Sequence, residues 1–218
     1  RPLTGTPVAA QVPMRWNHRM TVDYHDSLRQ ISTPSGVLRY HEAGDGPPLL
    51  LLHGSGPGVT GWRNYRGNLE AFARHFRCLV LEFPGFGVSD NFGGHPMVDA
   101  QGAVVTFADA LGLDRVDVIG NSMGGGVGIT FATKHPDRVR KLVTIGGIGT
   151  NIFSPAPSEG IRLLQEFTED PTRQRLIDWL RSMVYDPDLV TDELIEERWA
   201  LAAAPETLAA ARRMYGKA

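Results

Sequence analysis

Short apolar runs alternate with segments of helical periodicity over residues 48–147, and this alternation constrains the fold more than any other feature. The run "PLLLLH" at 48–53 is continuous, as in a strand buried on both faces of a parallel sheet. Further strands are predicted at 77–83, 115–120 and 139–147, and helices are predicted at 62–74, 98–111 and 123–135. Strands and helices in this order predict an α/β protein with a doubly wound, mostly parallel sheet.

The segments on either side of this region differ from it. Residues 20–32 and 37–43 are predicted to be two strands joined by a tight turn at "TPSG". Residues 156–216 show only helical periodicity, interrupted by prolines, which predicts three or four short helices. We therefore expect an α/β core over residues 1–150, and over 151–218 an all-helical insertion that ends with the start of the return to the core.

Composition excludes several classes of function. A net charge of −2 gives no support to binding of nucleic acid or of an anionic membrane. The longest apolar run, "PPLLLLHG", is too short to span a bilayer. Cys78 is the only cysteine, so an intrachain disulfide framework is excluded, and a reducing, cytoplasmic location is expected. Because Cys78 lies in "FRCLVLEF", we interpret it as a buried strand residue.

The segment "DVIGNSMGGGVG" places Ser122 between Gly120 and Gly124, directly after an apolar run. It matches G-x-S-x-G, in which a serine nucleophile sits on a sharp strand-to-helix turn and larger neighbours would collide with the sheet and helix. A predicted strand precedes the motif and a predicted helix follows it, as this interpretation requires. The alternative is a purely structural glycine-rich turn.

A second glycine-rich segment, "HGSGPG" at 53–58, follows the first buried strand. Such a bend exposes backbone N–H groups, and we expect those of Ser55 and Met123 to form an oxyanion hole. Open parallel sheets bind ligands at the carboxyl ends of their strands, where both segments lie. The alternative is a plain glycine-rich loop. His53 is interpreted as a structural histidine packed under this loop, with a catalytic base as the alternative.

Three segments in this order, "LLHGSGPGVTGWRN", "EFPGFGVSD" and "VIGNSMGGG", resemble the α/β-hydrolase fold. More narrowly, they resemble the meta-cleavage-product hydrolases, which cut carbon–carbon bonds in ring-opened catechols. "EGIRLL" and "MVYDPDLVTDELIEERW" resemble the helical lid of that family, so the resemblance runs from about residue 37 to the end. Haloalkane dehalogenases and epoxide hydrolases share the fold but would carry aspartate in place of Ser122.

The resemblance implies substrate-binding roles for several residues. Asn64 and Asn121 would hydrogen-bond the enolate oxygen or the carboxylate of the substrate, and the glycines Gly54 and Gly56 would border it. Arg198 matches a lid arginine that grips the carboxylate, a task suited to a forked donor. The alternatives are a helix cap or turn for Asn64 and a solvated place in a charged run for Arg198.

An apolar end of the binding pocket is expected from the lid. Trp179 and Met183 are four residues apart, which is one helical turn, and with Leu164 they would line this end. Packing within the lid is the equally favoured alternative. The resemblance implies no cofactor and no metal, a small carboxylate-bearing dienone as the partner, and a homo-oligomer, either a dimer or a tetramer.

The base that would activate Ser122 is missing from the sequence. In this fold the catalytic histidine follows the serine, and only His135 does so, at the far end of the predicted helix. Thirteen helical residues place His135 about 20 Å from Ser122. The family's "G-x-D-D" and "G-H-W" segments are absent as well. We therefore expect the first three quarters of a longer hydrolase, with the missing C-terminal segment in the same or a second chain.

The predicted function is hydrolysis of a carbon–carbon bond in a 2-hydroxy-6-oxo-2,4-dienoate by a serine-dependent hydrolase, with the 218-residue chain alone inactive. A carboxylesterase on the same fold is the first alternative, and Asn121 and Arg198 favour the dienoate over it. A non-catalytic binder of small molecules is the second alternative. The sequence leaves open the side group of the substrate and whether Ser122 forms an acyl-enzyme or activates water.

Overall fold

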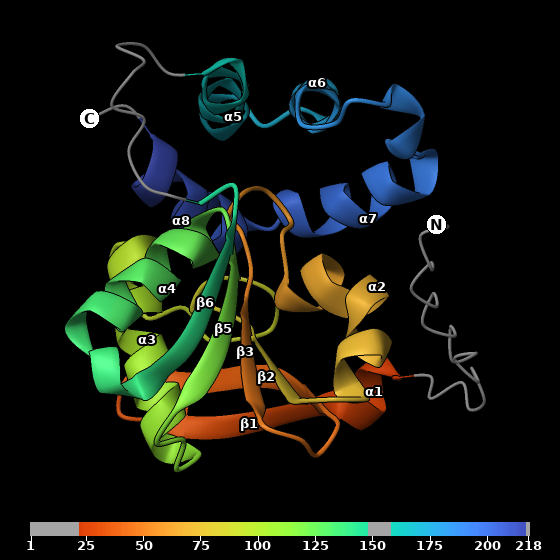
Figure 1. The fold of residues 1–218 in the computed structure, drawn as a ribbon. Coiled ribbons are helices and arrows are strands. Elements are labelled where there is room, and N and C mark those ends of the chain that lie inside the picture. The colour runs from red at the N-terminus through yellow and green to blue at the C-terminus, as the bar shows by residue number, and fades with distance from the viewer. Residues whose placement is uncertain (1–21, 148–157, 217–218) are drawn as a thin grey trace, which may run out of the picture.

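The computed structural model describes residues 22–147 and 158–216 of the chain. In this part a six-stranded sheet carries helices on both faces, and a layer of helices covers one end of it (Figure 1). The strand order is β1-β2-β4-β3-β5-β6, in which β4, β3, β5 and β6 pair in parallel and β1 and β2 are antiparallel. The strands are β1 Leu28–Thr33, β2 Gly36–Ala43, β3 Pro48–Leu52, β4 Arg77–Leu81, β5 Val116–Asn121 and β6 Val139–Ile145. This confirms the predicted doubly wound, mostly parallel sheet.

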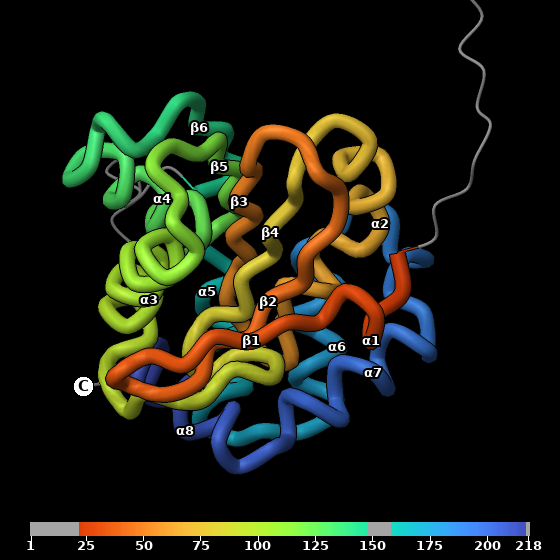
Figure 2. The backbone as a smooth tube through the Cα atoms, turned by 90° about the horizontal axis from the view of Figure 1, so that it is seen from below, coloured from red at the N-terminus to blue at the C-terminus, as the bar shows by residue number. Residues whose placement is uncertain are grey.

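Helices cover the two faces of the sheet unequally. Figure 2 shows α2 (Gly61–Ala73) on one side of β3 and β4, with α3 (Pro96–Ala110) and α4 (Met123–Lys134) on the other. Successive strand residues point to opposite faces, so each central strand contributes side chains to two apolar cores. The side chains that face α2 are Leu49, Leu51, Cys78 and Val80, and those that face α3 and α4 are Leu50, Leu52, Leu79 and Leu81. The prediction of Cys78 as a buried strand residue is confirmed.

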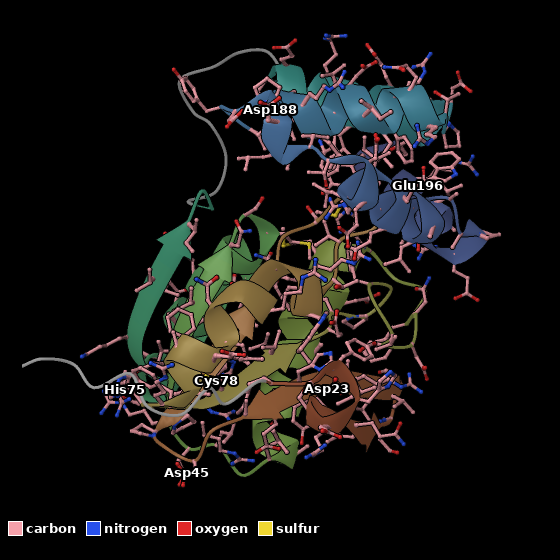
Figure 3. All side chains as sticks on the ribbon, turned by 90° about the vertical axis from the view of Figure 1, so that its right-hand side faces the viewer. Asp23, Asp45, His75, Cys78, Asp188 and Glu196 are labelled. Carbon is pink, nitrogen blue, oxygen red and sulfur yellow. The ribbon has the colours of Figure 1, made fainter. Side chains whose placement is uncertain are left out.

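The second layer, called the lid below, contains four helices and a short 3₁₀ turn among its described residues. These are α5 Glu159–Glu169, α6 Arg173–Ser182, the turn Pro187–Leu189, α7 Asp192–Ala202 and α8 Pro205–Tyr215. The lid has its own apolar core, formed by Leu164, Phe167, Leu176, Trp179, Leu180 and Ile195. Figure 3 shows Asp188 and Glu196 on this layer, far from His75, Cys78 and Asp45 in the core layer. The predicted all-helical character of the segment is confirmed for residues 158–216.

The predicted strand over residues 20–32 is wrong in its first half. Residues 20 and 21 lie outside the described residues, and Tyr24–Ser27 forms a helical turn, α1, before β1 begins at Leu28. The Asp23 carboxylate causes the difference, because its Oδ1 accepts hydrogen bonds from the N–H groups of His25 and Asp26. Such local side-chain bonds offer the backbone an alternative to a strand.

Other boundaries agree with the predictions to within a few residues. The turn at "TPSG" joins β1 to β2, and a 3₁₀ turn, Pro136–Arg138, leads into β6. The predicted border between the core and the insertion, at residues 150 and 151, lies outside the described residues. None of the helices in the described ranges has the length and the hydrophobicity needed to cross a bilayer.

Candidate active site

Ser122 occupies a strained turn between β5 and α4. Its φ of 49° and ψ of −114° make it the only non-glycine residue with positive φ among the residues described. A Cβ at Gly120 would lie 2.3 Å from the Gly124 carbonyl oxygen, and one at Gly124 would lie 2.3 Å from the Leu52 carbonyl oxygen. The glycines therefore allow the helix to approach the sheet, and Ser122, itself exposed, faces away from the core.

The glycine-rich segment 53–58 carries the predicted oxyanion donor Ser55, is called the oxyanion loop below after this prediction, and lies beside this turn. The Cβ position of Gly54 is 3.4 Å from the Ser122 Cβ. Neither Ser55 N–H nor Met123 N–H has a hydrogen-bond partner among the described residues. Met123 is the first residue of α4, where N–H groups lack intrahelical acceptors. Both N–H groups are therefore free of partners in the described part of the chain, and Met123 directly follows the serine.

Asn64, in the first turn of α2, connects the two segments. Its Oδ1 accepts one hydrogen bond from Gly54 N–H and another from Asn121 Nδ2, each 3.0 Å long. Thr60, and not Asn64, is the N-cap of this helix, so the helix-cap alternative for Asn64 is excluded. The Asn64 oxygen is fully used by these two bonds, and only its NH₂ group is left to face a ligand.

His53 lies beneath the oxyanion loop and is fully buried. Its Nδ1 donates to Gly54 O at 2.6 Å, and its Nε2 accepts from Phe83 N–H at 3.0 Å. Burial lowers the pKa of His53 to about 4, so the ring is neutral. Both nitrogens are engaged, which confirms the interpretation of His53 as a structural histidine.

The Glu82 carboxylate binds the N-terminal end of α2, the helix that carries Asn64. Its two carboxylate oxygens accept from Gly61 N–H at 2.7 Å and Trp62 N–H at 2.9 Å, at the start of α2. The carboxyl is 1% exposed, and burial raises its pKa to about 7. The Nε2 atoms of His41 and His53 lie 3.9 and 4.0 Å from it. This buried cluster fixes the end of α2 that carries Asn64.

A cavity of about 730 Å³ opens between the sheet end and the lid. Most of the predicted site residues line it, namely Gly54, Ser55, Asn64, Asn121, Ser122, Leu164, Trp179, Met183 and Arg198. Gly56 lies instead behind the Trp179 ring, and the Met123 side chain is buried in the core. The structure therefore brings residues of the core and the lid together around Ser122.

Among the described residues that line this cavity, Arg198, on α7, is the cation without an acidic partner. Its guanidinium lies 5.4 Å from the centre of the Trp179 ring, and its Nε is shielded from solvent with no hydrogen-bond partner among the described residues. Burial, and secondly the charge of Arg63, lowers the pKa of Arg198 to about 10. A solvated place in a charged run, the alternative considered from the sequence, is excluded by this burial.

The predicted apolar wall is partly packing and partly cavity surface. Leu164 and Trp179 are 4% and 3% exposed and belong to the core of the lid, whereas Met183, directly after α6, is 57% exposed. All three nevertheless border the cavity. Packing within the lid and lining of the pocket, the two alternatives considered from the sequence, therefore both apply to these three residues.

Several cavity residues were missed by the sequence analysis. Arg63 and Glu197 directly precede Asn64 and Arg198 in the sequence, so the segments "GWRN" and "EERW" contained a signal for them. Tyr215, at the end of α8, donates a hydrogen bond to Ser55 Oγ and borders the cavity. No motif marks Tyr215, because the contact joins segments 160 residues apart.

No histidine or aspartate is among the described residues that line the cavity. His135 follows the last residue of α4, a 12-residue helix that begins beside Ser122. A helix of this length separates the two residues by about 18 Å. The described residues therefore bring no imidazole to the Ser122 hydroxyl.

Comparison with known proteins places these features in a family. The model of the alpha/beta hydrolase fold matches residues 47–187. The chain is 37% identical to a 2-hydroxy-6-oxo-6-phenylhexa-2,4-dienoate hydrolase of Comamonas testosteroni, over 79% of the chain and 62% of the relative. It is 42% identical to a 2-hydroxy-6-oxononadienedioate/2-hydroxy-6-oxononatrienedioate hydrolase of Burkholderia vietnamiensis, over 74% of the chain and 58% of the relative.

A solved structure agrees with these relatives. A meta-cleavage product hydrolase from Pseudomonas fluorescens superimposes with a TM-score of 0.78 at 28% identity, over 85% of this chain and 67% of that one. The chain spans about three fifths of the length of the two curated relatives. Because the family model matches more than half of its residues, the chain belongs to the α/β-hydrolase fold family, within which it resembles the meta-cleavage-product hydrolases.

Proposed function

We propose that this chain carries the nucleophile, the oxyanion donors and most of the substrate pocket of a hydrolase that cleaves a carbon–carbon bond in a 2-hydroxy-6-oxo-2,4-dienoate. The observation that carries the proposal is the strained Ser122 turn, which lies beside the oxyanion loop at a cavity that an arginine without an acidic partner also borders. The names of the relatives support the same class of substrate.

The proposed roles follow from the geometry. Arg198 binds the carboxylate, and the NH₂ group of Asn64 donates a hydrogen bond to the same end of the substrate. The dienol is converted to its keto form by transfer of its hydroxyl proton to carbon, which creates an electron sink. Water or Ser122 then adds to the remaining ketone, and the N–H groups of Ser55 and Met123 stabilise the oxyanion. Collapse of the oxyanion breaks the adjacent carbon–carbon bond, whose electron pair passes into the keto group to give a dienolate that is then protonated. The other product leaves as a carboxylic acid, either directly or after water hydrolyses the Ser122 ester. Leu164, Trp179 and Met183 contact the side group.

The described residues supply no general base beside Ser122, so the source of this base is part of the proposal. We propose that a histidine and an acid outside them complete the site, supplied by a segment of the same or a second chain. The 218 residues alone then give negligible turnover, since loss of a triad member costs more than the ~10²–10³-fold lost with one oxyanion donor. The expected assembly as a dimer or tetramer stays a prediction, which gel filtration with light scattering checks.

The experiment compares Ser122→Ala with wild type in the full-length protein. The variant should lose hydrolysis of 2-hydroxy-6-oxo-6-phenylhexa-2,4-dienoate and labelling by a fluorophosphonate, yet still bind the dienoate. Ser35→Ala, at the exposed turn between β1 and β2, is the matched control and should retain both activities. Faster turnover of p-nitrophenyl acetate than of the dienoate would instead identify a carboxylesterase, and absence of labelling would identify a binding protein.

A further inference from the structure

A second arginine, Arg63, lies on the core side of the cavity that Arg198 borders from the lid. Arg63 is in the first turn of α2, where its N–H donates to the Thr60 Oγ at 3.0 Å. Its side chain is 19% exposed, so the guanidinium extends along the cavity wall and not into bulk solvent. The backbone of Arg63 is therefore fixed by the cap of the helix, and its side chain borders this cavity as well as a smaller one beside Tyr24 and Trp62.

Each arginine has one buried donor that makes no hydrogen bond to a described residue. Arg63 Nη1 and Arg198 Nε are shielded from solvent and make no hydrogen bond in the part of the chain that the structure describes. Arg63 Nη1 lies 2.8 Å from Glu197 Oε2, which is an ion pair without hydrogen-bond geometry. A buried donor without a hydrogen bond is unfavourable, so Arg198 would gain from an acidic acceptor. Arg63, which shares its one carboxylate partner with Arg66, would gain from the same acceptor.

The charges around the cavity favour one additional anion. Arg63, Arg66 and Arg198 line it together with Glu159 and Glu197, which leaves one net positive charge. Glu197 is shared, because it also lies 3.5 Å from Arg66 Nη2. The positive charge of Arg63 contributes to the lowered pKa of Arg198, after burial, so the two cations repel one another. A single carboxylate would neutralise the cavity and remove this repulsion.

The position of Arg63 also fits the proposed site. Arg63 directly precedes Asn64, whose oxygen holds Gly54 and Asn121 beside the nucleophile. An anion held by Arg63 therefore lies next to the residues that present Ser122. Because Arg63 is on the core and Arg198 is on the lid, the same anion joins the two layers (Figure 1).

We propose that Arg63 is a second binding residue for the substrate carboxylate, which it holds jointly with Arg198 while Glu197 keeps its pairing with Arg66. This inference rests on the proposed function and deepens it, since it assigns the recognition of the acid group to a pair of arginines from different layers. It follows that the acid should bind more tightly than its neutral ester.

Binding is measured in the full-length protein that carries Ser122→Ala, so that turnover does not interfere. The ligands are 2-hydroxy-6-oxo-6-phenylhexa-2,4-dienoate and its methyl ester, followed by their absorbance. Arg63→Gln should raise Kd for the acid at least about tenfold, as expected for a charge-assisted hydrogen bond, and leave Kd for the ester unchanged. Arg74→Gln, at the exposed C-terminal end of the same helix and outside the lining of the cavity, should change Kd for the acid less than about threefold.

The outcomes separate this inference from the proposed function. If wild type neither binds nor cleaves the dienoate, both are overturned. If wild type cleaves it but Arg63→Gln binds the acid as tightly as the parent, only the inference fails. Equal weakening of acid and ester binding would show a purely structural role for Arg63 and would also overturn the inference. Thermal unfolding of each variant confirms that it is folded.

Discussion

The side-chain amide of Asn121 donates a hydrogen bond to Asn64 Oδ1 at 3.0 Å, and the same oxygen accepts from Gly54 N–H. One atom on α2 thus holds both the strand end before the nucleophile and the oxyanion loop. The buried Glu82 carboxylate caps the helix on which this atom lies. The relative position of Ser122 and the predicted oxyanion donors therefore depends on α2 as much as on the sheet.

Asn64→Ala should lower kcat/KM for the dienoate by about 10²-fold, because loss of the shared acceptor lets the two segments move apart. Steady-state kinetics in the full-length protein measure the effect. Asn68→Ala, one turn further along α2 and exposed, is the matched control and should stay within about twofold of wild type. An unchanged kcat/KM in Asn64→Ala would show that the sheet alone positions the loop.

Tyr215→Phe removes the hydroxyl that donates to Ser55 Oγ. We expect kcat/KM to fall by about fivefold, since one neutral hydrogen bond that orients the oxyanion loop is lost. The effect should be on kcat more than on KM, because Tyr215 acts through Ser55. Tyr185→Phe, at a fully exposed position of the lid, serves as the control. A change in KM alone would indicate that Tyr215 contacts substrate directly.

Gly56→Ala should destabilise the contact between the lid and the oxyanion loop. The new Cβ would lie 2.6 Å from Trp179 Cη2, at a residue whose φ is +124°. Together the clash and the strain should lower the free energy of unfolding by about 2–4 kcal/mol, measured with urea. Gly67→Ala, in the middle of α2 with open space around it, should raise this free energy by about 0.5–1 kcal/mol. Equal stability of the two variants would contradict the placement of Trp179.

Stability should fall as the pH is lowered from 6.5 to 4.5. Burial lowers the pKa values of His41 and His53 from 6.5 to about 4, so the unfolded chain binds more protons and stability is lost on acidification. Burial raises the pKa of Glu82 from 4.5 to about 7, which acts in the opposite direction over the same window. Between pH 4.5 and 6.5 the unfolded chain thus binds up to two more protons at the two histidines and one fewer at Glu82 than the folded chain. The net difference of one proton gives the free energy of unfolding a slope of about 1.4 kcal/mol per pH unit.

Urea titrations at several pH values test this slope. His41→Gln should reduce it nearly to zero, because His53 and Glu82 then compensate each other. His75→Gln, at an exposed position, should leave the slope of wild type intact. A slope that is the same in His41→Gln and wild type would place its origin elsewhere in the protein.

The sequence by itself determined the order of strands and helices, because burial on a sheet or a helix leaves a periodic pattern in neighbouring residues. It also determined the turn at Ser122, since glycines flank that residue within the same short segment. The first half of the 20–32 strand was mispredicted, because the Asp23 carboxylate bonds to its own neighbours in a way that no apolar pattern records.

Only the tertiary structure decided which distant side chains share the cavity. Three such contacts join elements far apart in the chain. They are the placement of Arg63 and Arg198 at one cavity, the hydrogen bond from Tyr215 to Ser55, and the two hydrogen bonds accepted by Asn64. Such contacts depend on how the lid packs on the end of the sheet, where small differences in helix position change which atoms meet. Local sequence determines which face of each element is apolar, whereas three-dimensional packing determines which residues of separate elements come into contact.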